Sequence, residues 1–327
     1  MVSIPEGLKD SSGKSFYSLE VCNNAGDSMN LRIVLIFILL LTLFSGLAGA
    51  ATLEVGSGQN YLTIQSAVDA ANTGDVVSVN EGVYSENVIV KKSGISIIGK
   101  NKEKAIIDGK KASSGIKIDQ ASNVMLSGLT IRNSGGSGTS DAGITIYSAK
   151  DNVVVNMILI NNIVGVSVYT QCNNNIISGN EIRSNTNHGI FIYSSSNNKI
   201  YSNNIQENKI GVYVDQSKNN MIYANNFIDN SNEQGYDNGG QNSWDDGKSG
   251  NFWKNHKTGG EYIISGVPKA KDRYPLSSPA EIRYEQAAGK NPAKEETGKS
   301  TPGFEGFAGV ALFTAAALIR MRGRKIE

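Results

Sequence analysis

The sequence predicts an all-β fold: a single-stranded right-handed parallel β-helix, a solenoid with coils of about 22 residues, preceded by a short capping helix. Asn recurs 22 or 23 positions apart in three sets, with Met157 in the first place of the second set: Asn152, Asn175, Asn198 and Asn220; Met157, Asn180, Asn203 and Asn225; and Asn162, Asn185, Asn208 and Asn230. Aliphatic or aromatic residues recur between them, at Val154, Ile177, Ile200 and Ile222, and at Leu159, Ile182, Ile205 and Phe227. Each unit also contains Gly followed by a short alternating run, which is typical of a half-buried strand. Three short strands per repeat indicate coils that stack on one another.

The recurring Asn residues indicate the corners of these coils. Asn is unfavourable inside both helices and strands, so its regular spacing needs a structural reason. Asn can adopt the left-handed backbone conformation and bond locally in turns. Stacked coils would place each Asn above the previous one, and we expect the side-chain amides to form a ladder along the axis.

The residues before the regular repeat predict a cap and looser coils. The stretch "TIQSAVDAANTGD" predicts a helix with Thr63 as its N-cap and Gly74 as its stop. Its predicted buried face consists of Ile64, Ala67, Val68 and Ala71. Alternating aliphatic residues then predict about two irregular coils, with Val77, Val79, Val88, Val90, Ile95 and Ile97 pointing inward and Leu126, Leu129 and Ile131 following in the repeat frame. The run "GGSGTSD" predicts a loop of about six extra residues that leaves the coil.

The N-terminal part predicts an exported protein. Residues 29–50 combine a basic start at Arg32, an apolar run and the ending Ala48-Gly49-Ala50, which is the pattern of a cleaved signal peptide. The alternative is an uncleaved membrane anchor, since the run is near the lower length limit for a span. Residues 1–28 lack apolar periodicity, and we interpret them as an extension before the true start at Met29. Without Cys22, Cys172 would be the only cysteine, so no intrachain disulfide is expected.

The C-terminal part predicts a second membrane-related segment. The predicted domains are the β-helix over residues 51–278, a polar disordered linker over 279–301 and an apolar segment with a basic tail over 302–327. The simplest alternative for the last segment is a transmembrane helix. The net charge of +1 gives no indication of a nucleic-acid partner.

The sequence offers little for catalysis. Glycoside hydrolysis needs two carboxylates facing one bond, yet Asp215 has Tyr193 at the equivalent position of the previous coil. Asp245 and Asp246 are interpreted mainly as capping residues, with calcium ligation as a weaker alternative. No Asp cluster accompanies the scattered basic residues as a lyase would require, and no esterase set of two Asp and one Arg appears on neighbouring coils. We therefore favour a non-enzymatic protein without a cofactor.

Aromatic residues form the most informative candidate site. Alternation sends Tyr147, Tyr169 and Tyr193 outward at one equivalent position of three consecutive coils. Phe191 and Tyr213 add aromatic rings one step earlier in the strand, and Asp215 stands on the same face. Such rings can stack on one another and stabilise the solenoid, or they can bind sugar rings or a partner surface.

A family resemblance covers about residues 53–278. The stretch "YLTIQSAVDAANTGDVVSVNEGVYSENVIV", followed by "ISIIGKN" and "IIDG", resembles the NosD-like group of pectate-lyase-type β-helix proteins. The ending also matches, at Trp244, Asp245, Gly250, Asn251, Trp253, Asp272, Tyr274 and Pro275. The resemblance implies the fold firmly and the activity poorly. It raises copper delivery as an alternative, but the candidate ligands His188, His256, Cys172, Met125, Met157 and Met221 show no ligand spacing.

The C-terminal segment resembles a PGF-CTERM sorting signal of archaeal surface proteins, carried by Pro302, Gly303 and Phe304 with the basic tail. That resemblance implies an archaeosortase-type enzyme as a processing partner and a lipid anchor on the outer face of the membrane. The combined prediction is an exported surface protein with a structural or carbohydrate-binding role, whose partner is a polysaccharide or another envelope component. The alternatives are a polysaccharide lyase or glycoside hydrolase and a NosD-like copper-site maturation accessory.

Overall fold

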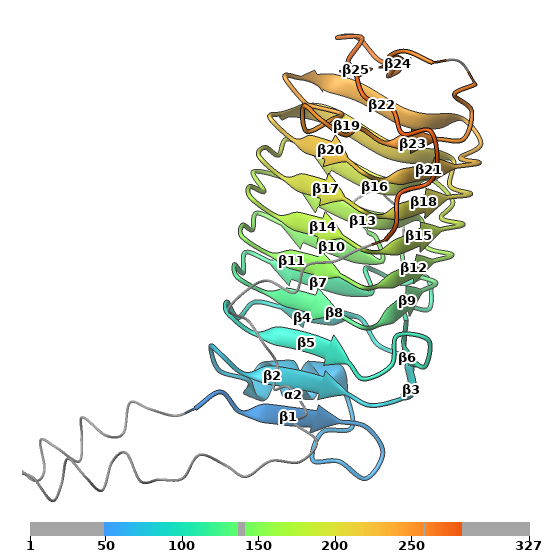
Figure 1. Ribbon diagram of the computed structural model, residues 1–327. Helices are drawn as coiled ribbons and strands as arrows, with labels where there is room; N and C mark the ends of the chain where they lie inside the picture. Colours follow the sequence, from blue (N-terminus) through green and yellow to red (C-terminus); the bar gives the residue numbers. More distant parts are fainter. Residues whose placement is uncertain (1–48, 137–140, 258, 283–327) are drawn as a thin grey trace, which may run out of the picture.

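The computed structural model describes residues 49–136, 141–257 and 259–282, and it shows a right-handed parallel β-helix. Three parallel sheets run the length of the solenoid, and each sheet takes one strand from every complete coil (Figure 1). The predicted all-β fold class is therefore confirmed.

The strands of each sheet follow the coil order. Sheet 1 consists of β1 (Thr52–Val55), β2 (Val76–Val79), β5 (Ser96–Gly99), β8 (Met125–Ser127), β11 (Val153–Val155), β14 (Ile176–Ser178), β17 (Lys199–Tyr201) and β20 (Met221–Tyr223). Sheet 2 consists of β4 (Val88–Val90), β7 (Ile116–Asp119), β10 (Ile144–Tyr147), β13 (Val164–Tyr169), β16 (His188–Tyr193), β19 (Ile210–Lys218) and β22 (Glu233–Gly240). Sheet 3 consists of β3 (Gly82–Tyr84), β6 (Ala105–Asp108), β9 (Thr130–Arg132), β12 (Ile158–Ile160), β15 (Glu181–Arg183), β18 (Asn204–Gln206), β21 (Asn226–Ile228) and β23 (Phe252–Trp253). A short antiparallel pair, β24 (Tyr262–Ile263) and β25 (Lys271–Asp272), follows.

The core is a set of columns in which equivalent side chains stack from coil to coil. Val154, Ile177, Ile200 and Ile222 stand in one column, and all four are fully buried. The predicted second column, from Leu159 to Phe227, is buried in the same way. The irregular early coils also place their predicted residues inside, including Val77, Val88 and Ile97. Alternation along the strands therefore predicted the inner face correctly.

The Asn ladder is confirmed, and it saturates every polar atom of its members. Asn180 shows the pattern: its backbone N–H and its Nδ2 both donate to Asn203 Oδ1 of the next coil, at 3.0 and 2.9 Å. Its Nδ2 also donates to the Val154 carbonyl, while its Oδ1 accepts the Met157 N–H. The side-chain amide thus makes two donations and one acceptance, so each of its polar atoms has a partner. The ladder Asn side chains are buried without a penalty for unpaired polar atoms.

The left-handed backbone conformation lies one residue before each ladder position, so that part of the prediction was wrong. The ladder residues have ordinary φ angles, whereas Asn197, Ser202 and Glu207 have φ of 60°, 54° and 55°. The residue that turns the chain faces outward, and its turn aims the following amide into the coil. Several residue types therefore occupy the turning position, while Asn occupies the ladder position in every regular coil except at Met157.

The capping helix α2 (Ile64–Ala70) closes the first end of the solenoid (Figure 1). As predicted, Thr63 is the N-cap and accepts the Ser66 N–H, and the predicted apolar face is buried. The helix ends earlier than predicted, because Ala71 is extended and fully buried, and Gly74 lies in the turn beyond it. Gln65 also bonds both backbone groups of Ile89 on β4, and so covers the edge of sheet 2.

Several predictions concern segments outside the described residues. These are the extension over residues 1–28, most of the signal over 29–50, most of the linker over 279–301 and the sorting segment over 302–327 with Pro302, Gly303 and Phe304. Residues 137–140 of the predicted loop are also outside the description. Within the described residues, no helix combines the length and hydrophobicity needed to span a bilayer.

Candidate functional site

The predicted tyrosines form a column on the outer face of sheet 2. Tyr147, Tyr169 and Tyr193 end β10, β13 and β16 and are paired in register. Their rings stack with centroids 6.2 and 5.1 Å apart and interplanar angles of 17°. Lys117 places its ammonium 4.8 Å from the Tyr147 ring centroid, at the lower end of the column. We call Tyr147, Tyr169 and Tyr193 the tyrosine column.

A second aromatic group lies beside this column. Phe191 and Tyr213 are paired on neighbouring strands with centroids 5.6 Å apart, and Tyr236 follows on β22 at 5.1 Å from Tyr213. His188 stacks on both Phe191 and Tyr213, at 5.3 Å in each case. Phe191 is only 6% exposed, so it supports the face and is not open to a ligand, in contrast to the predicted role.

The sequence did not point to His188 and Tyr236 as members of this face. Tyr236 could have been found from its register, because it occupies the position of Tyr213 in the next coil. His188 is the first residue of β16, and the paired positions of the neighbouring coils hold Val164 and Ile210. No repeated residue type therefore pointed to it. Burial, and to a lesser extent the charge of Lys209, lowers the pKa of His188 to about 4, so the ring is neutral at pH 7.

The geometry of the tyrosine column determines what it can bind. The rings are stacked along the solenoid axis, so Tyr169 has both faces covered by its neighbours. The ring edges and hydroxyls remain for contact with solvent, and the three side chains are half-buried. Among the described residues, these hydroxyls have no hydrogen-bond partner. Tyr213 stands beside the column, and burial together with the charges of Asp215 and Tyr236 raises its pKa.

A polar pocket of about 680 Å³ lies where β16, β19 and β22 end. Its lining consists of Ser194, Ser196, Gln216, Ser217, Lys218, Asn238, Gly239, Gly240 and Gln241. The pocket adjoins the tyrosine column, because Tyr193 directly precedes Ser194 and pairs with Asp215. The irregular pairing of β19 with β22 between Asp215 and Lys218 marks this place as a break in the repeat.

The two aspartates in the column of the tyrosines on sheet 2 do not form a catalytic pair. Asp119 and Asp215 stand in the same column of sheet 2 but four strands apart, which corresponds to about 19 Å. Glycosidases hold their two carboxyl groups within about 10 Å. Asp215 accepts a bond from Asn238 Nδ2 at 3.2 Å.

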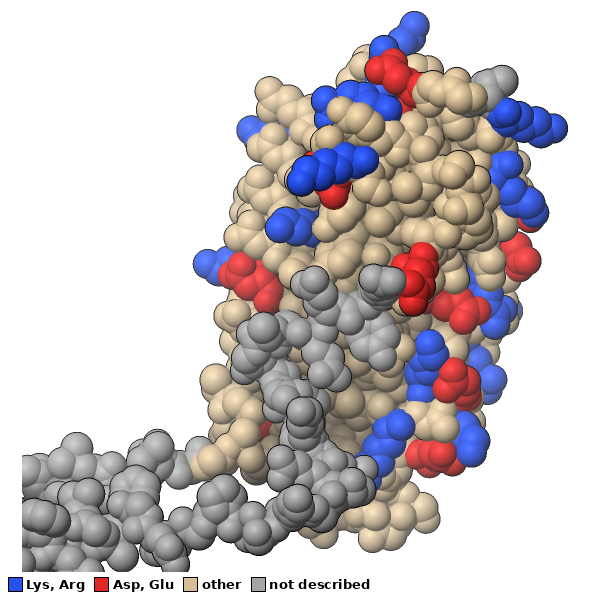
Figure 2. Space-filling model, viewed as in Figure 1, with Lys and Arg blue, Asp and Glu red and all other residues tan. Residues whose placement is uncertain are grey.

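On sheet 3, the carboxylates are held in ion pairs. Asp108 is bonded by Arg132 at 2.9 Å and by Asn133 at 3.0 Å, and Glu181 pairs with Arg183 on its own strand. Burial would raise the pKa of Asp108, but its hydrogen bonds and the Arg132 charge together lower it. The outer face in Figure 2 shows the same pattern, with red and blue side chains mostly next to one another along its sides. These ion pairs are surface contacts and provide no proton-transfer group.

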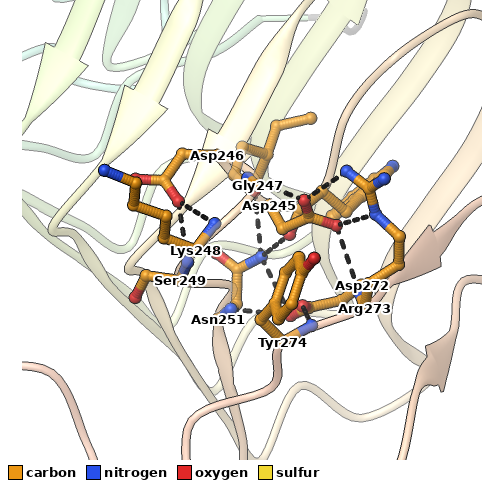
Figure 3. Close-up of polar contacts among 11 residues, drawn as sticks. Asp245, Asp246, Gly247, Lys248, Ser249, Asn251, Asp272, Arg273 and Tyr274 are labelled. Atoms are coloured by element: carbon orange, nitrogen blue, oxygen red, sulfur yellow. Dashed lines mark hydrogen bonds and ion pairs between the residues drawn. The ribbon is translucent and has the colours of Figure 1, made fainter.

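The predicted capping residues Asp245 and Asp246 have different hydrogen-bond partners (Figure 3). Both lie in residues 242–276 after the last complete coil, which we call the closing segment. Asp245 is 2% exposed and binds the Arg273 guanidinium at 2.6 and 3.0 Å. Burial favours a higher pKa for Asp245, but bonds from Arg273 and the Gly247 N–H hold the pKa below its usual value. Asp246 caps a turn by accepting the N–H groups of Lys248 and Ser249. The described residues contain no group of three His, Cys, Asp or Glu side chains arranged for a metal ion.

Two further aspartates each end one Asn ladder, and Gln234 ends the third. Asp272 is fully buried and accepts bonds from Asn251 N at 2.6 Å, Trp253 Nε1 at 2.8 Å and Tyr274 N at 3.0 Å. Burial, aided by the Asp245 charge, raises the pKa of Asp272 despite these bonds. Gly250 leaves the space that the Asp272 carboxylate fills. Asp237, which the sequence did not reveal, accepts bonds from Asn242 Nδ2 and Trp244 Nε1, each at 3.0 Å.

The candidate copper ligands do not come together in the structure. Cys172 is buried at a corner, where its thiol donates to the Ile146 carbonyl and burial raises its pKa. His188 lies among aromatic rings on sheet 2, and His256 bonds Gly260 O in the closing segment. The methionines are separate as well: Met157 is in the core, and Met125 and Met221 lie on the outer side of sheet 1, four strands apart. The described residues therefore do not fit a copper site.

Comparison with known proteins gives one partial relative and several distant structures. A probable pectinesterase/pectinesterase inhibitor 17 from Arabidopsis thaliana is 32% identical over 112 residues, which cover 31% of this chain and 22% of that protein. The chain thus matches less than a quarter of the length of this curated relative.

The structures include Geobacillus virus E2 ORF18 (13% identity, TM-score 0.47, 68% of this chain and 48% of that one) and a PL6-family alginate lyase (15%, 0.43, 59% and 31%). A pectin methylesterase from carrot has 15% identity and a TM-score of 0.37, covering 53% of this chain and 64% of that one. No statement on activity follows from these similarities.

The family comparison covers most of the β-helix. The family model for NosD, described as a periplasmic copper-binding protein, matches residues 54–258. This match extends from β1 through the coils and into the closing segment, and it agrees with the resemblance in "YLTIQSAVDAANTGD" and "NSWDDGKSGNFWKNH". The chain belongs to the NosD family.

Proposed function

We propose that this protein is a non-enzymatic, extracytoplasmic β-helix that binds a hydroxyl-rich glycan of the cell envelope on the outer face of sheet 2. The observation that carries the proposal is the tyrosine column, whose hydroxyls have no partner among the described residues, beside a pocket lined by amides and hydroxyls. Buried amides in the same molecule are fully paired. Unpaired polar groups in a fixed row are therefore available for a ligand.

The chemistry of a glycan suits this face. Sugar hydroxyls both donate and accept hydrogen bonds, as do the phenol groups and the Ser and Gln side chains of the pocket. The apolar ring edges can contact the C–H groups of a sugar. Since the strands hold Tyr169 and Tyr193 in register, binding would require little loss of side-chain entropy.

The enzyme alternatives lack support from the site. The curated relative is named a pectinesterase, and this name supports a polysaccharide as the ligand class. A hydrolase would need two converging carboxylates, and Asp119 and Asp215 are far apart. Asp245 and Asp272 lie nearer to each other, but both are buried and bonded by protein groups. A copper-maturation role would need ligands that the described residues do not bring together.

The family description supports a location outside the cytoplasm. We extend the proposal to anchoring on the outer face of the membrane through residues 302–327, with removal of the tail by an archaeosortase-type enzyme. Mass spectrometry of the mature C-terminus tests this extension. Retention of residues 320–327 would contradict the cleavage.

A binding assay with hydroxyl-deletion variants tests the proposed face. Affinity electrophoresis of the purified protein in gels containing a panel of polysaccharides identifies a ligand, and release of oligosaccharides is measured on the same panel. Tyr193→Phe retains the stacked ring and removes the hydroxyl, so we expect about threefold weaker binding, comparable to the loss of a hydrogen bond of about 0.7 kcal/mol. Tyr201→Phe is the matched control, because Tyr201 stacks on Tyr223 on sheet 1, away from the face.

Each result has a clear meaning. Retardation by a glycan that Tyr193→Phe weakens and Tyr201→Phe leaves unchanged supports the proposal. Equal effects of the two variants, or no binding to any glycan, overturn the proposed face. Release of oligosaccharides with turnover overturns the non-enzymatic role.

A further inference from the structure

The polar pocket has an unbalanced charge. Nine residues line it, and among them Lys218 is the one charged side chain. The other side chains are neutral donors and acceptors, with Gln216, Asn238 and Gln241 supplying amides. A pocket with one cation, several donors and no lining carboxylate favours a ligand with a negative charge.

Lys218 differs from the lysines that stand near carboxylates elsewhere on the solenoid. Ion pairs join Lys100 to Glu54, Lys104 to Glu81, Lys117 to Asp119, Lys254 to Asp229 and Lys271 to Glu261. Lys218 is exposed and has no such partner among the described residues. Its charge is therefore available for a ligand.

The backbone around this pocket departs from the regular repeat. The sheet 2 strands β13 and β16 end at Tyr169 and Tyr193, and the chain then turns at residues with positive φ. β19 also turns at this corner, where Gln216 has φ of 46°, but its pairing with β22 is irregular after Asp215. The repeat is thus broken where β22 stacks on β19, and Lys218 stands above Ser196 at the rim, as Ser196 stands above Asn173.

Asp215 on β19 and Asp237 on β22 are the carboxylates next to the pocket, and neither lines it. Asp237 is buried and bonded by Gly239, Asn242 and Trp244. Asp215 is partly exposed. It stands in the column of Tyr193, where its Oδ1 accepts the Asn238 amide at 3.2 Å. The arrangement places an acceptor toward the tyrosine column and a cation toward the pocket. A ligand that follows the column would meet an acceptor for its hydroxyls first and a positive charge second.

We propose that this pocket binds the negatively charged substituent, a carboxylate or a sulfate ester, of an acidic glycan whose sugar rings lie along the tyrosine column. The inference rests on the proposed glycan-binding function and specifies its ligand class. Lys218 supplies the charge, and the amides of Gln216 and Gln241 supply donors. The tyrosine column makes contacts with the sugar rings that are the same for an acidic and a neutral glycan.

Matched oligosaccharides test the charge requirement. Titration calorimetry compares a hexameric uronate oligosaccharide with its carboxyl-reduced form, and a sulfated hexasaccharide with its desulfated form. Each is titrated into the full protein and into Lys218→Gln and Lys199→Gln. Lys199 is the matched control, because it is an exposed lysine on β17 of sheet 1, outside the pocket.

We expect an acidic form to bind more tightly than its neutral partner, and Lys218→Gln to weaken that binding about fivefold, as for an exposed charge pair. Lys199→Gln should bind like the parent protein, and added salt should reduce the difference between the acidic and neutral forms. The pair that shows the larger difference identifies the carboxylate or the sulfate as the preferred group.

The failures are distinguishable. Equal binding of acidic and neutral forms, or equal effects of Lys218→Gln and Lys199→Gln, overturns the inference about the pocket. The proposed function then stands if Tyr193→Phe still weakens binding. If none of the oligosaccharides binds while a glycan of the electrophoresis panel does, the inference is overturned and the proposed function stands.

Discussion

The corner ladder and the tyrosine column are both built from one residue type repeated at equivalent positions, yet they differ in what they leave unpaired. Each ladder amide, such as Asn180, makes all of its hydrogen bonds within the protein. The rings of the tyrosine column contact one another, but the described residues offer no partner to their hydroxyls. A repeated residue can therefore specify the fold or present a surface, and the hydrogen-bond inventory distinguishes the two.

Removal of a ladder amide should have the largest effect. Asn203→Ala leaves Asn180 N and Nδ2 without their acceptor in a buried site, and we expect about 3 kcal/mol or more of lost stability. Urea unfolding followed by circular dichroism measures this loss. Asn232→Ala is the control, since that side chain is exposed and should change stability by less than about 0.5 kcal/mol. Similar losses in the two variants would contradict the role of the ladder.

Truncation within the tyrosine column should cost less. Tyr169→Ala removes two stacked contacts, and we expect a loss of about 2 kcal/mol. Tyr169→Phe keeps the stack and removes only an unpaired hydroxyl, so its stability should stay within about 0.5 kcal/mol of the parent. Thermal unfolding of both variants gives the comparison. A large loss in Tyr169→Phe would show that the hydroxyl has a structural partner.

His188 should make stability depend on pH. Its pKa of about 4 in the folded protein is below the value of about 6.5 expected in the unfolded chain. The unfolded chain therefore binds the proton first as the pH falls from 7 to 5, and this stabilises the unfolded state by about 1–2 kcal/mol.

The His188→Phe variant isolates this effect. It retains an aromatic ring between Phe191 and Tyr213 but cannot bind a proton. We expect its free energy of unfolding to fall less than that of the parent between pH 7 and pH 5. Identical pH profiles would rule out the predicted titration.

The turning positions before the ladder should give the smallest effect. Ala224 has φ of 51°, a conformation that Asn adopts more readily than Ala. Ala224→Asn should raise stability by about 0.5 kcal/mol, measured by the midpoint of urea unfolding. The substitution leaves Asn225 and its bonds to Asn251 in place. A loss of stability would mean that the side chain at this corner has a packing role.

The sequence predicted the repetitive part of the molecule well. Period-two alternation and the 22-residue spacing were sufficient for the inward columns, such as Ile177 above Val154, and for the stacked amides. The turn at Asn197 was misplaced by one residue, because spacing alone does not show which of two adjacent positions carries the positive φ.

The candidate site was predicted only in part. Equivalent positions identified the tyrosine column, but the low exposure of Phe191 depends on its neighbours across strands. The pocket lies at an irregular corner after Asp215, and a search for repeated patterns does not detect a feature that occurs once. Asp237 was missed for the same reason, since it bonds two side chains that follow it in a non-repeating segment.

The direction of the ladder bonds has a consequence for how such proteins change in length. Every ladder amide donates toward the C-terminal coil, so each column needs a final acceptor. The carboxylates of Asp237 and Asp272 meet that need in two columns, and the side-chain carbonyl of Gln234 meets it in the third. In a duplicated unit such as residues 175–197, the ladder amides would accept bonds from the preceding coil and donate bonds to the following coil. Both ends of the ladder would keep their partners. Whole coils can therefore be inserted between existing coils, whereas the segment that ends the ladders must keep its acceptor residues.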